Sequence, residues 1–177
     1  MDTVGAVGDP RLWLVYHYWW RKRRGRLMPA PDNIVVSELP DAVQPNIMVL
    51  EVVETLGGPR FRYVKVGPVF WRAGGADPSG RFVDEVLPQT AGYRDYVVGI
   101  YEEMAIRRRP MYTENVFILS HGYSDPMATK RVSLPLSRDG VAVCAVLAGH
   151  TFDYGASGPE AFTLVTAIQE VVRKFLE

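Results

Sequence analysis

Residues 141 to 148 read VAVCAVLA, and this stretch constrains the fold more than any other part of the chain. Successive side chains of a β-strand point to opposite faces of a sheet, so a strand that is apolar at every position is buried on both faces. The stretch therefore predicts the central strand of a sheet that is covered on both sides. We expect helices that connect strands to cover one face. An N-terminal helix, a C-terminal helix or a second copy of the chain is expected to cover the other.

Length, charge and cysteine content narrow the class of protein. The 177 residues suffice for one domain with its own core. Because 20 basic residues balance 20 acidic ones, we do not expect nucleic acid as a main partner. The only cysteine, Cys144, allows no internal disulfide, which is typical of the reducing cytoplasm. We identify no signal peptide and no apolar run long enough to cross a membrane, so we predict a cytoplasmic protein.

The N-terminal part of the chain divides into a flexible segment over residues 1 to 9 and a second segment over residues 10 to 46. Asp9 and Pro10 are typical of a helix start, and Gly25 is typical of a helix end. We therefore predict a helix over residues 10 to 24, followed by a proline-rich linker that wraps the domain.

One face of this helix is strongly aromatic, because large rings repeat at helical spacing. Such a face removes a large area from water only when something covers it. We expect it to dock on the domain or on a partner, through Trp13, Tyr16 and Trp20. The basic run over residues 21 to 26 either complements the helix dipole or contacts an anion.

Residues 47 to 153 are predicted to form the core of the domain. Two β-branched runs joined by Gly57 and Gly58 predict an antiparallel hairpin. Short helical turns follow, and apolar spacing then predicts a long helix over residues 90 to 108. Three further strands are expected to start near residues 111, 129 and 141.

The C-terminal segment, residues 157 to 177, is predicted to be a helix because its apolar residues repeat at intervals of three and four. This helix is expected to dock on its own domain, to pair with a second copy or to bind a different protein. The interface residues predicted on it are Phe162, Val165, Ile168, Val172 and Phe175.

Several local motifs accompany this order of elements. They are Tyr18-Trp19, Gly25-Arg26-Leu27-Met28-Pro29, Gly75-Ala76-Asp77-Pro78-Ser79-Gly80-Arg81, Asp84-Glu85-Val86-Leu87 and Leu134-Pro135-Leu136-Ser137. In these motifs the chain resembles the PAS-like domain family common in alphaproteobacteria, over roughly residues 12 to 153. Met28 is an insertion into the family pattern. The motifs consist mostly of turns and packing positions, so they specify a fold better than an activity.

The resemblance implies an α+β fold with a five-stranded antiparallel sheet in the order 2-1-5-4-3. Crossover helices would lie on one face, with the terminal helices flanking the sheet and a pocket between sheet and helices. Domains of this family type bind small molecules, haem or flavin, dimerise through flanking helices and signal to an effector.

Neither a cofactor nor a catalytic group is predicted. A flavin photosensor of this fold needs a reactive cysteine on a helix, whereas Cys144 lies in a predicted strand. A haem sensor commonly takes its ligand from the long helix, which has no histidine. His17, His121 and His150 are scattered, and no metal site is expected. Ser120-His121 and Asp84-Glu85 do not have the geometry of catalytic pairs.

The pocket between sheet and helices is the remaining candidate site. An apolar wall with tyrosine hydroxyls suits a lipid-like or aromatic ligand, although the same residues would also fill a solid core. The predicted pocket residues are Phe70, Trp71, Tyr96, Ile100, Tyr101, Met104, Val132 and Val146.

Two functions follow from this sequence. The first is a PAS-like regulatory module that forms a homodimer and binds a small apolar ligand or a protein effector, without enzymatic activity. The alternative is an enzyme or carrier with a cone-like α+β fold, in which Asp84 or Tyr101 would face the cavity.

Overall fold

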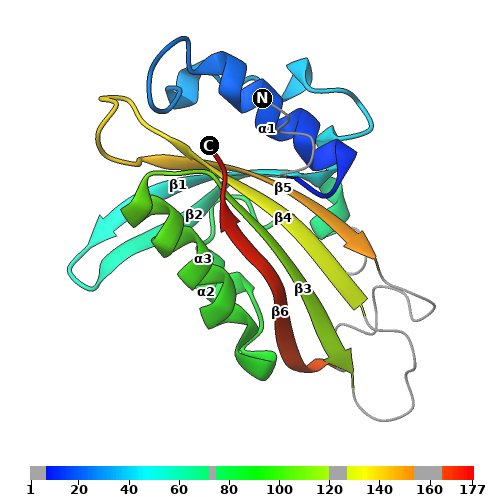
Figure 1. Cartoon of the computed structure of the whole chain (residues 1–177). Coiled ribbons are helices and arrows are strands. Elements are labelled where there is room, and N and C mark those ends of the chain that lie inside the picture. The colour runs from blue at the N-terminus through cyan, green and yellow to red at the C-terminus, as the bar shows by residue number, and fades with distance from the viewer. Residues whose placement is uncertain (1–6, 72–74, 120–126, 154–164) are drawn as a thin grey trace.

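The computed structural model describes residues 7–71, 75–119, 127–153 and 165–177. It is an α+β fold in which one six-stranded antiparallel sheet has helices on both faces (Figure 1). The strands lie in the order β2-β1-β5-β4-β3-β6. They are β1 Ile47–Thr55, β2 Gly58–Val66, β3 Met111–Leu119, β4 Met127–Leu136, β5 Ala145–Asp153 and β6 Val165–Phe175.

The α+β class is confirmed, but the predicted five-stranded sheet in the order 2-1-5-4-3 is not matched exactly, because the sheet has six strands in the order 2-1-5-4-3-6. The first five strands lie in the order β2-β1-β5-β4-β3, and β6 adds to the outer edge of β3. An unpaired edge strand leaves a row of backbone donors and acceptors without partners. The sixth strand supplies those partners along the whole of β3.

The prediction of a C-terminal helix is therefore wrong for the described residues, because Val165–Phe175 form the strand β6. Residues of β6 pair antiparallel with β3 from Val165 opposite Leu119 to Phe175 opposite Met111. Two register shifts along this pairing break the simple alternation of faces, so the apolar residues repeat at intervals that resemble a helix. The many β-branched residues of VTAIQEVVRKF favour a strand.

The central position of β5 confirms the main expectation from the sequence. The strand lies between β1 and β4, and its first seven residues are buried. It begins at Ala145 rather than at Val141, which is exposed. Cys144 lies just before the strand and is half-buried rather than part of the core.

Helix α1, Pro10–Lys22, begins as predicted at the residue after Asp9. The Asp9 carboxylate accepts a hydrogen bond of 2.8 Å from the backbone N–H of Arg11, which satisfies one free amide of the first turn. Three short 3-10 helices follow in the linker: Pro31–Asn33, Val36–Glu38 and Gln44–Asn46.

Helix α1 covers one face of the sheet, and the segment between β2 and β3 supplies the helices that cover the opposite face (Figure 1). It contains α2 Val83–Val86, the long helix α3 Tyr93–Arg107, and the 3-10 turns Pro68–Phe70 and Thr90–Gly92. Gly67, where this segment begins, has no room for a side chain. An added Cβ would lie 2.2 Å from the backbone oxygen of Pro45.

Each face of the sheet has its own hydrophobic core. We call the core beneath α1 the α1-side core; it includes Leu12, Trp19, Leu134 and Leu147. We call the core beneath α2 and α3 the cavity-side core, because a cavity described below also lies on this face; the core includes Leu50, Phe61, Ile100, Met104 and Val146. Both faces of β5 are therefore covered from within one chain.

Helix α1 approaches the sheet closely. A Cβ at Gly149 would lie 3.2 Å from Val15 and 3.3 Å from Leu12, so the glycine provides the room for the helix. The indole N–H of Trp19, which is fully buried, donates a 2.8 Å hydrogen bond to the carbonyl of Pro135. These contacts fix the helix on the sheet.

The residues predicted to lie in an interface mostly contact their own domain. On α1, Tyr16 is buried and donates a hydrogen bond to the carbonyl of Glu177, Trp13 packs beside the α1-side core, and Trp20 is 49% exposed. On β6, Val165 is buried and belongs to the cavity-side core. Ile168 and Phe175 pack against that core and Val172 packs against the other. Phe162 lies outside the described residues.

Candidate functional site

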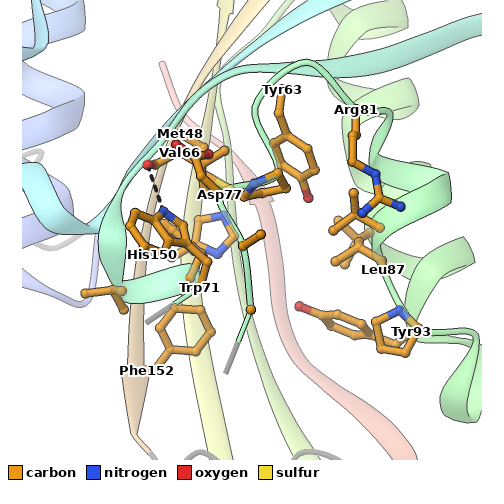
Figure 2. Close-up of a pocket in the computed structure, with 18 of the residues that line it drawn as sticks. Met48, Tyr63, Val66, Trp71, Asp77, Arg81, Leu87, Tyr93, His150 and Phe152 are labelled. Atoms are coloured by element: carbon orange, nitrogen blue, oxygen red, sulfur yellow. Dashed lines mark hydrogen bonds between the residues drawn. The ribbon is translucent and has the colours of Figure 1, made fainter. Parts of the chain in front are cut away.

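A cavity of about 560 Å³ lies between the sheet and the α2–α3 layer (Figure 2). Its volume falls within the range of small-molecule sites in proteins. Aromatic residues form much of its wall: Tyr63, Phe70, Trp71, Tyr93, Tyr101 and Phe152. Charged or ionisable groups at its surface include Asp77, Arg81, Arg131 and His150.

One side of the cavity is a packed group of rings. Phe70 meets His150 edge to face at 5.0 Å between ring centroids, and meets Phe152 in the same way at 5.5 Å. The indole N–H of Trp71 donates a 3.4 Å hydrogen bond to the carbonyl of Val66, shown as a dashed line in Figure 2. This side of the cavity is thus held in place by ring contacts and by one hydrogen bond to the backbone.

Arg131 is the most unusual residue of the site. It lies on β4, lines the cavity and is only 1% exposed. Its Nε donates a 3.0 Å hydrogen bond to His150, while its Nη1 has no hydrogen-bond partner among the described residues. It also forms no ion pair with a carboxylate of the described part of the chain. A buried charge is costly without a partner, so Arg131 requires an explanation.

His150 orients the guanidinium of Arg131. It lies directly opposite Arg131 in the pairing of β4 with β5. Burial and the nearby positive charge of Arg131 hold the pKa of His150 far below its usual range. The imidazole is therefore neutral at physiological pH and accepts the hydrogen bond from Arg131 through Nε2.

Tyrosine hydroxyls provide the neutral polar groups of the cavity. Figure 2 shows the hydroxyls of Tyr63 and Tyr93 pointing toward its middle. Burial raises the pKa of Tyr101 to about 12, and it raises the pKa values of Tyr63 and Tyr93 as well. All three remain protonated at neutral pH and can donate a hydrogen bond. The Tyr101 hydroxyl has no partner among the described residues.

Further polar side chains are buried beside Arg131 on the same face of the sheet. Thr113 lies opposite Arg131 across the β3–β4 pair, Asn115 lies opposite Thr129, and Ser133 follows two residues after Arg131. Together with Arg131 they form a set of five residues that we call the buried polar strip: Thr113, Asn115, Thr129, Arg131 and Ser133. Each is 1% exposed, and each has at least one polar side-chain atom without a hydrogen-bond partner in the described part of the chain. Native cores contain only a few such groups per hundred residues.

The structure brings together three of the eight predicted pocket residues at the cavity. Phe70, Trp71 and Tyr101 line it. The remaining residues on that face belong to the cavity-side core or pack against it without lining the cavity: Tyr96, Ile100, Met104 and Val146.

The prediction that Val132 lines the pocket is wrong, because this residue lies in the α1-side core on the opposite face of the sheet. Its two neighbours, Arg131 and Ser133, point to the cavity side, and a strand alternates its faces at every residue. Arg131 and Val132 therefore face opposite sides of the sheet, so a prediction that puts Val132 in the pocket leaves Arg131 out of it.

Sequence reasoning missed Arg131 altogether and treated His150 as an isolated histidine. A signal was present in TKRVSLPLS, where Thr129, Arg131 and Ser133 alternate with apolar residues. Such alternation usually indicates a strand with one face in water. The structure instead covers that face with α3, so the polar side chains are buried.

Other residues considered for chemistry lie elsewhere. Asp84 forms an ion pair of 2.9 Å with Arg60 and is not among the described residues that line the cavity. His17 is stacked on Trp13, and Ser120 and His121 lie outside the described residues. No group of three or more potential metal ligands occurs within residues 7–71, 75–119, 127–153 and 165–177.

Comparisons with known proteins add no assignment: no family model matches the chain, and no curated protein or solved structure shows significant similarity to it. Among the helices of the described residues, none combines the length and apolar character needed to cross a bilayer.

Proposed function

We propose that this chain is a PAS-like regulatory module that binds a small, mainly apolar ligand in the cavity between the sheet and α2–α3. The observation that carries the proposal is the cavity of about 560 Å³, whose wall is largely aromatic and carries polar groups at defined positions. Small-molecule sites share this combination of apolar walls and a few placed polar groups. The order of the first five strands supports the PAS-like part of the proposal.

The ligand would act by changing the layer that covers it. Leu87, which follows α2, lines the cavity together with Tyr93 and Val97 of α3. A ligand that contacts these residues stabilises one position of the α2–α3 layer relative to the sheet. A protein effector that binds the outer surface of this layer would then bind the ligand-occupied and the ligand-free protein with different affinities. Homodimer formation and a cytoplasmic location remain predictions from the sequence.

The alternative, an enzyme or carrier, is supported by one feature only. Tyr101 lines the cavity, as that alternative requires, whereas Asp84 is engaged by Arg60. Turnover of a bound compound that is lost in Tyr101→Phe would favour the enzyme. Binding that persists in this variant without turnover favours the regulatory module.

Binding of an aromatic probe tests the proposed function. We expect 2-naphthamide to bind the full chain with one site in calorimetry. Replacement Leu87→Trp fills part of the cavity and should weaken binding by about tenfold or more, because overpacked sites exclude ligand volume. The matched variant Leu56→Trp adds the same ring at a fully exposed position and should leave binding unchanged. Binding that is absent, or equal in the two variants, would overturn the proposal.

A further inference from the structure

The charge of Arg131 indicates what kind of ligand the cavity accepts. Its guanidinium is buried within the protein but its Nη1 is unpartnered among the described residues. Removing a charge from water costs several kcal/mol unless an opposite charge or a full set of hydrogen bonds replaces the water. The cavity that Arg131 lines is where such a partner would bind.

The other charged residues among the described lining of the cavity do not supply that partner. Asp77 also lines the cavity, but its carboxylate accepts hydrogen bonds of 2.9 and 2.7 Å from the backbone N–H and the hydroxyl of Ser79. Arg81, the other arginine of the lining, is exposed. Its charge is therefore solvated, whereas that of Arg131 is not.

The neighbours of Arg131 prepare it to bind an anion. His150 is a neutral acceptor that occupies Nε, so the guanidinium is oriented without losing its net charge. The Tyr101 ring lies 5.8 Å from the guanidinium carbon, and its unpartnered hydroxyl also belongs to the cavity lining. Guanidinium and hydroxyl donors together match the oxygens of one carboxylate.

We propose that the cavity binds a monocarboxylate, whose carboxylate is held by Arg131 and whose apolar body lies against the aromatic wall. This inference rests on the proposed function and specifies the ligand class of the same site. Among the described lining residues, Arg131 is the buried arginine and Arg81 is exposed, so one buried positive charge matches one negative charge. The wall formed by Phe70, Trp71 and Phe152 favours an aryl or alkyl body over a sugar or nucleotide.

Two probes of the same shape test this inference on the unchanged chain. The acid 2-naphthoate is an anion at pH 7, whereas 2-naphthamide is neutral, and the ring systems are identical. We expect the acid to bind at least about tenfold more tightly in calorimetry, because hydrogen bonds to charged groups are about twice as strong as neutral ones.

Variants then assign the preference to one arginine. Arg131→Leu should remove the preference for the acid while leaving amide binding within about threefold. Arg131→Lys keeps the charge and should retain part of the preference. Arg107→Leu removes an exposed arginine that is not among the described residues lining the cavity, and this matched control should keep the full preference. Because the acid and amide are first compared on the wild-type chain, the test does not depend on any variant folding.

The outcomes separate this inference from the proposed function. Equal binding of acid and amide, with both weakened by Leu87→Trp, would keep the cavity as a ligand site and overturn the carboxylate. A preference that survives Arg131→Leu in a folded variant would overturn the role of Arg131. Failure of both probes to bind the wild-type chain at millimolar concentration would overturn the inference together with the proposed function.

Discussion

The two faces of the sheet are built from the same strands but are packed in different ways. On the α1 side, Trp19 is fully buried with its N–H hydrogen-bonded, and Gly149 lets the helix approach within van der Waals contact. On the α3 side, a cavity of about 560 Å³ lies beside the buried polar strip, which includes Arg131. The buried indole of the first face has its hydrogen-bond partner, whereas the second face gathers most of the buried polar side-chain atoms that lack a partner among the described residues, as binding sites commonly do.

Truncation of Trp19 should give the largest loss of stability on the α1 side. Trp19→Ala removes a fully buried ring and leaves the Pro135 carbonyl without its donor. We expect the free energy of unfolding to fall by about 3–5 kcal/mol, measured by urea denaturation. Trp20→Ala, at a half-exposed position on the same helix, is the control and should cost much less. Similar losses at the two positions would contradict the docking of α1.

Alanine substitutions at two glycines test how closely α1 packs on the sheet, independently of the Trp19 substitution. Gly149→Ala places a methyl group 3.2 Å from Val15, and we expect a loss of about 1–3 kcal/mol from overpacking. Gly99→Ala, in α3, meets nothing within 4 Å. It should raise the free energy of unfolding by about 0.5–1 kcal/mol, because alanine loses less conformational freedom in a helix. A gain in stability at both positions would show that α1 is not tightly docked.

The buried histidine of the cavity side should make stability depend on pH. The folded-state pKa of His150 lies far below its unfolded value of about 6.5. Above pH 6.5 both states are neutral at this residue. Below it only the unfolded chain binds the proton, so stability falls by about 1.4 kcal/mol per pH unit.

Urea denaturation at pH 7.5, 6.5 and 5.5 checks this dependence. The wild-type chain should lose about 1 kcal/mol more than His150→Gln between pH 6.5 and 5.5. Identical slopes for the wild type and His150→Gln would show that His150 binds its proton as readily in the folded chain as in the unfolded chain, and would contradict the account.

The buried polar strip should respond to substitution in the opposite sense from the α1 side. Thr113→Val replaces a buried hydroxyl that has no partner among the described residues with a methyl group of similar shape. We expect the free energy of unfolding to rise by about 1 kcal/mol. The control Thr166→Val removes an exposed hydroxyl that donates to the Ile118 carbonyl and should not stabilise. A loss of stability in Thr113→Val would indicate that its hydroxyl is hydrogen-bonded in solution.

The sequence predicted those elements whose signals are local. Asp9 and Pro10 marked the start of α1, Gly57 and Gly58 marked the hairpin, and the uniformly apolar run marked the central strand. The C-terminal segment was predicted wrongly, because its apolar spacing fits a helix, while the open edge of β3 that selects a strand is a property of the assembled sheet.

The candidate site depended on information that is not local. Phe70, Trp71 and Tyr101 were found because large aromatic residues beside a predicted pocket are conspicuous. Arg131 was missed because alternation alone does not say whether a polar face meets water or a covering helix. That choice is made by the placement of α3, which the spacing of Thr129, Arg131 and Ser133 does not encode.

The most direct measurement is a titration of 2-naphthoate into the full chain, followed by NMR of the tryptophan indole N–H groups. Trp71 lines the cavity, whereas Trp19 belongs to α1 and packs in the α1-side core on the opposite face, so each reports on one side of the sheet. We expect the Trp71 resonance to shift to saturation while the Trp19 resonance stays within its line width. A shift of Trp19 without one of Trp71, or no shift of either, would contradict this expectation.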